Sequence, residues 1–357
     1  MSNTSQASSR DIGGPLLELT DVKTHFRTRR GLVRAVDGVS LTLERGKSLG
    51  IVGESGSGKT ILSRSIMGLL PTKGTERHGS IRFQGKEIGN LGRKQMRHIW
   101  GKEMAMIFQD PMTSLNPLMK IGRQITEPLE IHLGMDKDNA WATAERLMQD
   151  VRIPEGARRL HQYPHELSGG MRQRVMIAIA MACGPTMLFA DEPTTALDVT
   201  VQAQILDLLN DQRKERNMSL ILVTHDLGVV AGHTDEIAVM YGGKLVEKAP
   251  TRVLFADMKM PYTEALMQSI PKIDDPSHTR LLAIGGRPPD LVNPPIGCRF
   301  APRCLYARDQ CLTEEPPLRA TDNPEHTYAC WYPVGSPEYH EAKARLGETP
   351  VTVGGLD

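Results

Sequence analysis

The sequence contains no long hydrophobic run. Its longest unbroken apolar stretch, Val175–Cys183, has nine residues, whereas a helix that crosses a bilayer needs about 20. The N-terminal stretch MSNTSQASSRDIGG is polar and lacks the apolar segment of a secretory signal peptide. From these absences we expect a protein that stays in the cytoplasm and meets a membrane only through a partner.

The chain also carries almost no net charge. Its 43 lysines and arginines and 42 aspartates and glutamates leave +1, which argues against a surface built for nucleic acid or anionic lipid. Four of the five cysteines lie after residue 297. In a reducing compartment this clustering favours a metal or cluster site over disulfides.

Short apolar segments alternate with helical patterns through most of the chain. Helices are predicted over 60–70 and 199–216, and a mainly helical stretch over 119–183 is punctuated by Pro128, Pro154 and Pro164. Strands are predicted at LLEL, SLGIVG, EMAMIF, TMLFAD and SLILVT, with a hairpin formed by EIAVMY and GKLVEK. This alternation indicates an α/β fold around a parallel sheet, with a helical insertion between 110 and 185.

Proline marks a change of character after residue 270. Thirteen of the 24 prolines fall in the last 87 residues, which argues against long helices there. We therefore expect a disordered tail over 1–14, the main α/β domain over 15–270, and a loop-rich extension over 271–357 whose cysteines substitute for a core.

A glycine-rich segment, GESGSGKT, follows the strand SLGIVG and fits the pattern G-x4-G-K-[ST]. Its backbone N–H groups can turn onto a phosphate at the helix N-terminus, and Lys59 can reach the β- and γ-phosphates. The Thr60 hydroxyl can coordinate Mg²⁺. A chance glycine turn is the alternative, and the correct flanking elements argue against it. The predicted phosphate-binding residues are Gly53, Glu54, Ser55, Gly56, Ser57, Gly58, Lys59 and Thr60.

Polar residues follow three of the predicted strands, the usual place for active-site groups in an open α/β sheet. Asp191 and Glu192 end one strand, Gln109 follows the second, and His225 follows the third. Asp191 can bind Mg²⁺ with Thr60, and Glu192 can polarise an attacking water. Gln109 can join the magnesium shell and sense the γ-phosphate, which His225 can hydrogen-bond. Taken singly, each is also explained as a solvated turn residue.

These motifs, in this order, resemble the ATP-binding cassette (ABC) family. The resemblance implies a P-loop nucleotide-binding domain with a RecA-like parallel core, an antiparallel β part and an inserted helical subdomain. HELSGGMRQRV resembles the family's signature segment, which completes the ATP site of a second cassette. Ser168, Gly169 and Gly170 would then cap the γ-phosphate of a partner chain, and two cassettes would enclose two ATP molecules. Standing alone, the segment would be a simple N-cap serine with a Gly-Gly turn.

Two further matches to the family are weaker. Ala196-Leu197-Asp198 resembles the loop by which two cassettes touch, which assigns Asp198 to the partner's ATP site. Phe26 lies where the family carries an aromatic that stacks on adenine, although a core or strand-end aromatic explains it nearly as well. Met171 replaces the glutamine of the commonest signature and affects no phosphate contact.

Longer stretches resemble the ATPase subunits of dipeptide, oligopeptide and nickel importers, in their D-type rather than F-type form. They are IFQDPMTSLNP, GMRQRVMIAIAMA and ADEPTTALDVTVQAQIL. The resemblance implies a peripheral ATPase on the cytoplasmic face of the inner membrane that powers peptide uptake. Its implied partners are an F-type ATPase subunit, two transmembrane permease subunits and, indirectly, an extracytoplasmic peptide-binding protein.

Other cargoes and another function were weighed against peptide uptake. Nickel, glutathione or another small solute is an alternative cargo for the same subunit type. A soluble ABC ATPase acting on nucleic acid or the ribosome is disfavoured, because the chain has one cassette, no long coiled coil and little net charge.

The late cysteines are separated by five, six and eighteen residues. This spacing matches neither paired zinc motifs nor ferredoxin runs, and it leaves the metal open. The tail resembles the peptide-importer subfamily, where such a quartet is associated with a [4Fe-4S] cluster; structural zinc and free or disulfide-linked thiols are the alternatives. Arg299 and Arg303 could offset cluster charge, although solvated side chains are the simpler expectation. The predicted cluster ligands are Cys298, Cys304, Cys311 and Cys330.

Overall fold

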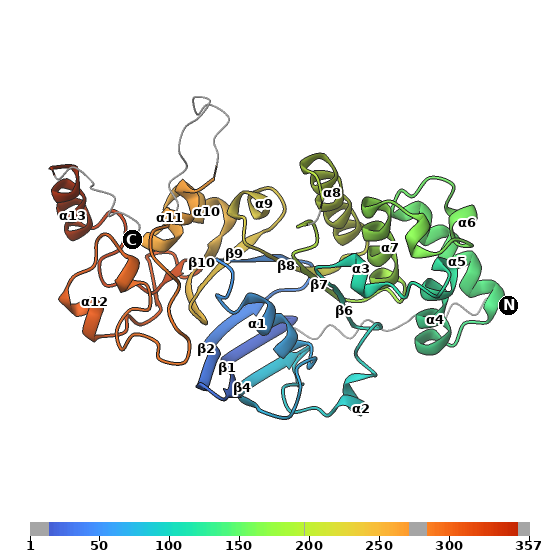
Figure 1. The fold of residues 1–357 in the computed structure, drawn as a ribbon, viewed down its shortest axis with the longest axis horizontal. Coiled ribbons are helices and arrows are strands. Elements are labelled where there is room, and N and C mark those ends of the chain that lie inside the picture. The colour runs from blue at the N-terminus through green and yellow to red at the C-terminus, as the bar shows by residue number, and fades with distance from the viewer. Residues whose placement is uncertain (1–13, 196, 271–283, 349–357) are drawn as a thin grey trace.

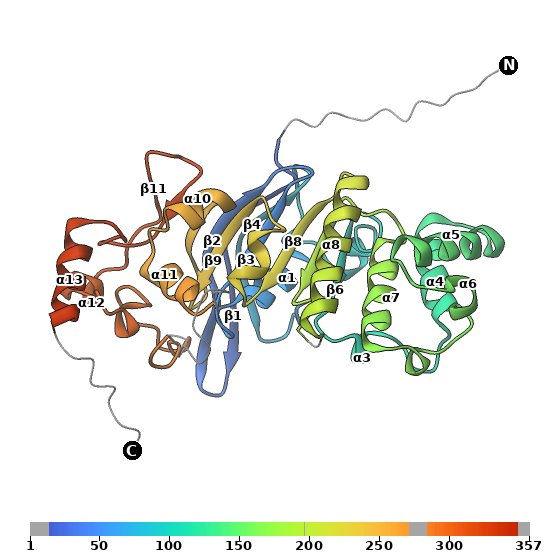
Figure 2. The same ribbon diagram turned by 90° about the horizontal axis from the view of Figure 1, so that it is seen from above.

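The structure, a computed structural model, describes residues 14–195, 197–270 and 284–348. The predicted disordered tail therefore lies outside the described residues, except for Gly14. The molecule is elongated, with a helical part at one end, the C-terminal extension at the other and two sheets between them (Figure 1, Figure 2). Within the described ranges, no helix combines the length and apolarity needed to cross a membrane.

The larger sheet contains eight strands in the order β11-β12-β10-β9-β3-β8-β7-β6. The five from β9 to β6 are parallel, and β10 pairs antiparallel with β9 as the predicted hairpin. Strands β3, β7 and β8 are buried along their whole length, because both faces of the sheet are covered. The central bounds are β3 Ser48–Val52, β6 Met104–Ile107, β7 Met187–Asp191, β8 Ser219–Thr224, β9 Glu236–Tyr241 and β10 Lys244–Pro250.

Side chains of the parallel strands alternate between two hydrophobic clusters. In β7, Leu188 packs with the helical part, and Phe189 packs with α1 and the second sheet, as the two-residue period of a strand requires. This double burial explains why the core strands are continuous apolar runs in the sequence. The helices along this sheet are α1 Lys59–Ile66, α8 Val199–Glu215, α9 Leu227–Ala231, α10 Thr251–Ala256 and α11 Pro261–Gln268.

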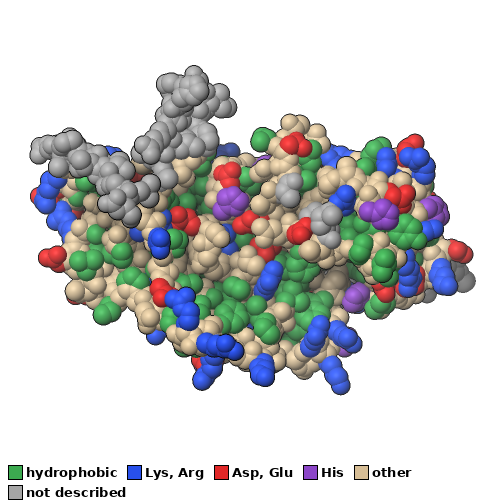
Figure 3. Space-filling model, viewed as in Figure 1, with side chains coloured by type: hydrophobic (Ala, Val, Ile, Leu, Met, Phe, Trp, Pro, Cys, Tyr) green, Lys and Arg blue, Asp and Glu red, His purple; other side chains and the backbone are tan. Residues whose placement is uncertain are grey.

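The smaller sheet is antiparallel, in the order β2-β1-β4-β5. Its first strand runs for 12 residues, far beyond the predicted LLEL segment. Exposed polar residues separate the buried ones in β2 and β4, so no continuous apolar run marks these strands in the sequence. Lysines and arginines gather along the edge of the molecule near this sheet (Figure 3). The bounds are β1 Leu17–Thr28, β2 Gly31–Leu43, β4 Thr75–Phe83, β5 Lys86–Glu87 and the following α2 Arg93–Met96.

The helical part occupies the predicted insertion between β6 and β7. Pro128 does not interrupt it as expected, because it lies inside α4. Ile125 and Leu129 flank this proline and are fully buried, and their burial outweighs the lost backbone hydrogen bond. The bounds are α3 Pro111–Ser114, α4 Ile121–Leu133, α5 Lys137–Asp150, α6 Gly156–Arg159, the 3-10 turn η1 Pro164–Glu166 and α7 Gly169–Met181.

The extension continues the larger sheet, since β12 pairs with β10. Beside this contact, His326 Nε2 lies 2.9 Å from Oε1 of the fully buried Glu247. The proline-rich region nevertheless ends in α13, a helix of 12 residues. It forms because Pro337 takes the first helical position, where proline is tolerated, and no proline follows within it. The bounds are η2 Ala301–Arg303, α12 Asp309–Thr313, β11 Arg319–Ala320, β12 Thr327–Tyr328 and α13 Pro337–Glu348.

Candidate functional site

The segment GESGSGKT, called the phosphate loop below, forms the turn between β3 and α1. Gly53 and Gly58 have φ angles of +155° and +103°. A Cβ would lie 2.1 Å from the Met240 carbonyl oxygen at the first position and 2.3 Å from the Ala35 carbonyl oxygen at the second. Only glycine fits backbone packing this close, so neighbouring strands of both sheets impose the two glycines.

Lys59 begins α1 and is 4% exposed. Its Nζ donates hydrogen bonds to the carbonyl oxygens of Gly53, at 2.6 Å, and Glu54, at 2.9 Å. Burial lowers the pKa of Lys59, and the charges of Glu192 and Asp191 oppose this shift. A buried cation held over a glycine loop is suited to bind a phosphate group.

The Thr60 hydroxyl donates a hydrogen bond to Asp191 Oδ1 at 3.0 Å, joining α1 to the end of β7. Burial raises the pKa of Asp191, against the opposing effects of this hydrogen bond and the charge of Arg64. A divalent cation would favour the ionised carboxylate. Across the described ranges, no three His, Cys, Asp or Glu side chains are arranged to hold one metal ion. Thr60 and Asp191 are the residues here that could hold such a cation, since Mg²⁺ commonly takes one or two protein ligands and keeps several waters.

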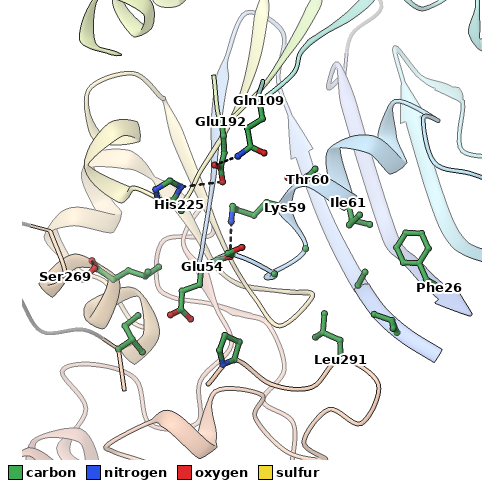
Figure 4. Close-up of a pocket in the computed structure, with 18 residues that line it drawn as sticks. Phe26, Glu54, Lys59, Thr60, Ile61, Gln109, Glu192, His225, Ser269 and Leu291 are labelled. Atoms are coloured by element: carbon green, nitrogen blue, oxygen red, sulfur yellow. Dashed lines mark hydrogen bonds and ion pairs between the residues drawn. The ribbon is translucent and has the colours of Figure 1, made fainter. Parts of the chain in front are cut away.

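Glu192 follows β7 and connects the ends of three strands. Its Oε2 accepts hydrogen bonds from Gln109 Nε2 at 3.1 Å and from Thr195 Oγ1 at 2.9 Å. His225 Nδ1 lies 3.4 Å from its Oε1. The φ angle of Glu192 is +47°, which is strained for a residue other than glycine. The hydrogen bond from the Glu192 N–H to the Val223 carbonyl fixes this conformation. The three predicted strand-end side chains thus converge above the phosphate loop (Figure 4).

These groups face one cavity of about 980 Å³. Phe26 of β1 lines it on the side away from Glu192 (Figure 4). Of the predicted ligand residues on the loop and strand ends, Gly53, Ser57 and Asp191 are buried and do not line it. Eight lining residues were missed, because they are small or apolar and belong to no motif: Val33, Ala35, Ile61, Leu266, Ser269, Ile284, Pro288 and Leu291.

The signature segment does not reach this cavity. None of Ser168, Gly169 and Gly170 lines it, and the first two are exposed. Ser168 is the N-cap of α7, and its Oγ accepts a hydrogen bond from the Met171 N–H at 3.3 Å. The segment therefore presents an open helix N-terminus to the outside of its own chain.

A second helix N-terminus adjoins the signature segment. Asp198 caps α8 by accepting a hydrogen bond from the Val201 N–H at 3.0 Å. A Cβ on Gly170 would lie 3.0 Å from Val201 Cγ1, so the first turns of α7 and α8 are in contact. The two segments predicted to serve a partner chain are thus neighbours, although Ala196 lies outside the described residues.

The four late cysteines line one small cavity of about 20 Å³. All are free thiols, so the disulfide alternative is not realised. Burial raises the pKa of Cys304 to about 12 and also raises the pKa of Cys298 and of Cys330. The described residues provide no set of three ligands for a metal ion here either, so the arrangement supports neither the predicted [4Fe-4S] cluster nor the structural-zinc alternative.

Arg299 and Arg303 are not solvated as expected, and neither lines the cysteine cavity. Arg299 is 7% exposed and donates to the Gly242 carbonyl and the Asp37 carboxylate. The side chain of Arg303 is 4% exposed and pairs with Glu54. Their acidic partners are far away in sequence, so no local pattern indicates the pairing.

Comparison with known proteins identifies the family. The model of the ABC transporter family matches residues 36–195, and that of the oligopeptide/dipeptide transporter C-terminal region matches 246–311. The oligopeptide transport ATP-binding protein OppD of Haemophilus influenzae is 48% identical over 317 residues, which are 89% of this chain and 97% of the relative. The chain belongs to this family of ABC transporter ATP-binding proteins. OppD of Bacillus subtilis is 50% identical over 304 residues, 85% of each chain.

Solved members of the ABC family share the fold. A dimeric ATP-binding cassette in a post-hydrolysis state, bound to ADP and Pi, matches with a TM-score of 0.60 and 26% identity, covering 66% of this chain and 99% of that one. CbiO1 from Clostridium perfringens, part of the ABC transporter complex cbiONQ, gives a TM-score of 0.58 at 25% identity, covering 68% and 91%. The predicted ABC-type P-loop fold is therefore confirmed.

Proposed function

We propose that this chain is the ATP-hydrolysing subunit of an ABC importer for dipeptides or oligopeptides. The observation that carries the proposal is the convergence of Glu192, Gln109 and His225 above a glycine-rich loop. The chain that holds this site is related, over nearly its whole length, to oligopeptide transport ATP-binding proteins.

ATP occupies the cavity with its phosphates on the phosphate loop and its base toward Phe26. The loop N–H groups and Lys59 bind the β- and γ-phosphates. Thr60 and Asp191, with Gln109 nearby, provide the Mg²⁺ site. The metal ion neutralises charge on the phosphate oxygens.

Glu192 acts as the general base for the attacking water. Its carboxylate is held by Gln109, Thr195 and His225, so it can be positioned without the nucleotide present. Gln109 contacts the magnesium shell, and His225 hydrogen-bonds the γ-phosphate. Positioning and charge stabilisation, rather than covalent chemistry, carry this type of reaction.

A second ATPase subunit completes the site. Ser168, Gly169, Gly170 and Asp198 do not line the cavity of their own chain and would contact the γ-phosphate bound by a partner. We propose an F-type paralogue as this partner. The γ-phosphate would be contacted from both sides only in the closed pair, so ATP binding shifts the population toward closure.

The pair works beneath two transmembrane permease subunits at the cytoplasmic face of the inner membrane. The test is peptide uptake by vesicles that carry the permease subunits, both ATPase subunits and a peptide-binding protein. ATP-dependent uptake of a labelled tripeptide that stops with Glu192→Gln supports the proposal. Uptake of Ni²⁺ but not of peptide contradicts it, and so does an ATP hydrolysis rate that is the same with and without peptide and permease.

We further propose that Cys298, Cys304, Cys311 and Cys330 bind a [4Fe-4S] cluster. The support is that all four side chains line one cavity in an otherwise loop-rich region. The four cysteines would hold the cluster through their thiolates, the usual ligands of such clusters. When bound, the cluster would staple the extension.

A further inference from the structure

An ion pair joins the phosphate loop to the C-terminal extension. Arg303 Nη1 donates to Glu54 Oε2 at 2.6 Å, and Nη2 donates to Oε1 at 3.0 Å. This bidentate geometry is the strong form of an arginine–carboxylate pair. Glu54 is the second residue of the loop, and Arg303 lies directly before Cys304, so the cysteine-bearing segment and the phosphate loop share one anchor.

Every donor of the Arg303 guanidinium is used. Besides its two bonds to Glu54, it donates to the Tyr241 hydroxyl at 3.2 Å, the Gly285 carbonyl at 2.8 Å and the Ile284 carbonyl at 3.0 Å. An arginine has five N–H donors in a fixed fork. Lysine, with three donors on one nitrogen, cannot reproduce this set.

Glu54 is held on its other sides as well. Its N–H donates to the hydroxyl of the buried Tyr262 at 2.8 Å, and its carbonyl accepts from Lys59. Tyr262 packs with Tyr241 and Phe300, with ring centroids 4.5 and 5.3 Å away. The extension thus supports the loop by packing as well as by charge.

The same extension lines the nucleotide cavity through Ile284, Pro288 and Leu291. The Leu291 carbonyl accepts a hydrogen bond from the Arg34 N–H of β2 at 2.9 Å, which fixes this wall to the antiparallel sheet. In Figure 4 the Glu54 side chain points away from Lys59, on the side of the pocket where Leu291 lies. Glu54 lines the cavity, its side chain is 27% exposed, and its carboxylate pairs with Arg303.

We propose that Arg303 of the extension is a positioning residue for the nucleotide site, which holds Glu54 in place and neutralises its carboxylate beside the triphosphate. The inference rests on the proposed phosphate loop. Without Arg303, an unpaired carboxylate would remain in the cavity proposed to bind the triphosphate and would repel it. The effect belongs to nucleotide binding rather than to the chemical step.

The test is a double-mutant cycle in the full-length chain, with trinitrophenyl-ATP as the binding probe. Arg303→Gln is expected to weaken binding about tenfold, which corresponds to 1.4 kcal/mol, and to raise KM for ATP similarly while kcat changes less than about threefold. Glu54→Gln in the same chain removes the repelling charge and is expected to restore most of the affinity. Arg303→Lys keeps the positive charge but lacks the forked donor group, so its affinity for the probe is expected to lie between those of the parent and of Arg303→Gln.

The rescue identifies the unpaired Glu54 charge as the cause, because a defect from losing the other Arg303 bonds, to Tyr241, Ile284 and Gly285, would not be repaired by Glu54→Gln. Arg308→Gln is the matched control, since Arg308 lies in the same extension and pairs with the exposed Glu341. Unchanged affinity in Arg303→Gln, or a double variant as weak as the single one, overturns the inference. If Arg303→Gln does not fold, Arg303→Lys and the double variant still decide the outcome. Lys59→Ala that binds the probe normally would instead refute the phosphate loop itself.

Discussion

The Gln109 side-chain amide donates a hydrogen bond to the Glu192 carboxylate across 3.1 Å, connecting the ends of β6 and β7. Gln109 is followed directly by the segment that leads into the helical part. If the γ-phosphate moves Glu192, as the proposed function implies, this hydrogen bond would couple that movement to the segment. The Gln109–Glu192 hydrogen bond thus connects the proposed base to the segment between β6 and the helical part.

Glu192→Gln is expected to keep ATP binding and lose hydrolysis. The amide preserves the shape of the side chain but cannot accept the proton of the attacking water, so the rate should fall about 10²- to 10⁴-fold. Because ATP then persists, a closed pair should accumulate and be visible by size-exclusion chromatography with ATP. Glu325→Gln, an exposed site in the extension, is the control. Hydrolysis at the parental rate would show that Glu192 is not the base.

Asp191→Asn is expected to stabilise the nucleotide-free protein and abolish hydrolysis. Burial raises the pKa of Asp191, so the folded state binds its proton more tightly than the unfolded chain does. The folded protein is therefore increasingly destabilised as the pH rises through that pKa. The melting temperature of Asp191→Asn should exceed that of the parent, and the gap should widen as the pH rises from the ordinary aspartate pKa toward the raised pKa of Asp191. A gap that shrinks with pH would contradict the burial of an ionised carboxylate.

Ser168→Ala should separate capping from catalysis. Losing an N-cap costs about 1 kcal/mol of stability, and Asp136→Ala removes the equivalent cap of α5, where Asp136 accepts from the Asn139 N–H at 2.9 Å. The melting temperatures of both variants should lie below that of the parent by similar amounts. Only Ser168→Ala should lower the ATPase rate of the pair, with nucleotide binding to its own chain unchanged. Equal ATPase rates in the two variants would show that Ser168 caps the helix and does not contribute to ATP hydrolysis.

Purification without oxygen should yield brown protein containing about four iron and four sulfide ions per chain, the stoichiometry of the proposed cluster. Cys304→Ser should lose the colour and the iron, and the extension should become sensitive to limited proteolysis. Cys183→Ser, far from the quartet in sequence, should retain both. A colourless parent that contains one zinc ion would refute the cluster.

The fold was predictable wherever burial on both faces gives an apolar run. The strands at 48–52, 187–191 and 219–224 are fully buried, and their sequences predict them directly. The long β1–β2 hairpin was only partly predictable, because a sheet with exposed polar residues lacks such runs. Pro128 was misjudged as a break, since the packing of α4 rather than local propensity decides the continuation of that helix.

The site was predictable where a motif fixes the residue and its neighbours. The glycines of the phosphate loop follow from its turn, and the strand-end polar residues from the topology of a parallel sheet. Leu291, which lines the nucleotide cavity, and Arg303, which pairs with the lining residue Glu54, were not predictable as parts of this region. The extension brings them there through that ion pair and through a backbone hydrogen bond between Leu291 and β2, and neither contact has a local sequence signal.

The central claim is that ATP is hydrolysed only where two chains meet. It is tested most directly by measuring the ATPase rate per chain during serial dilution from the micromolar to the nanomolar range, with the second subunit at a fixed ratio and oligomeric state followed by mass photometry. We predict that the rate per chain falls toward zero as the pairs dissociate, while trinitrophenyl-ATP still binds. An undiminished rate from dissociated single chains would contradict the account.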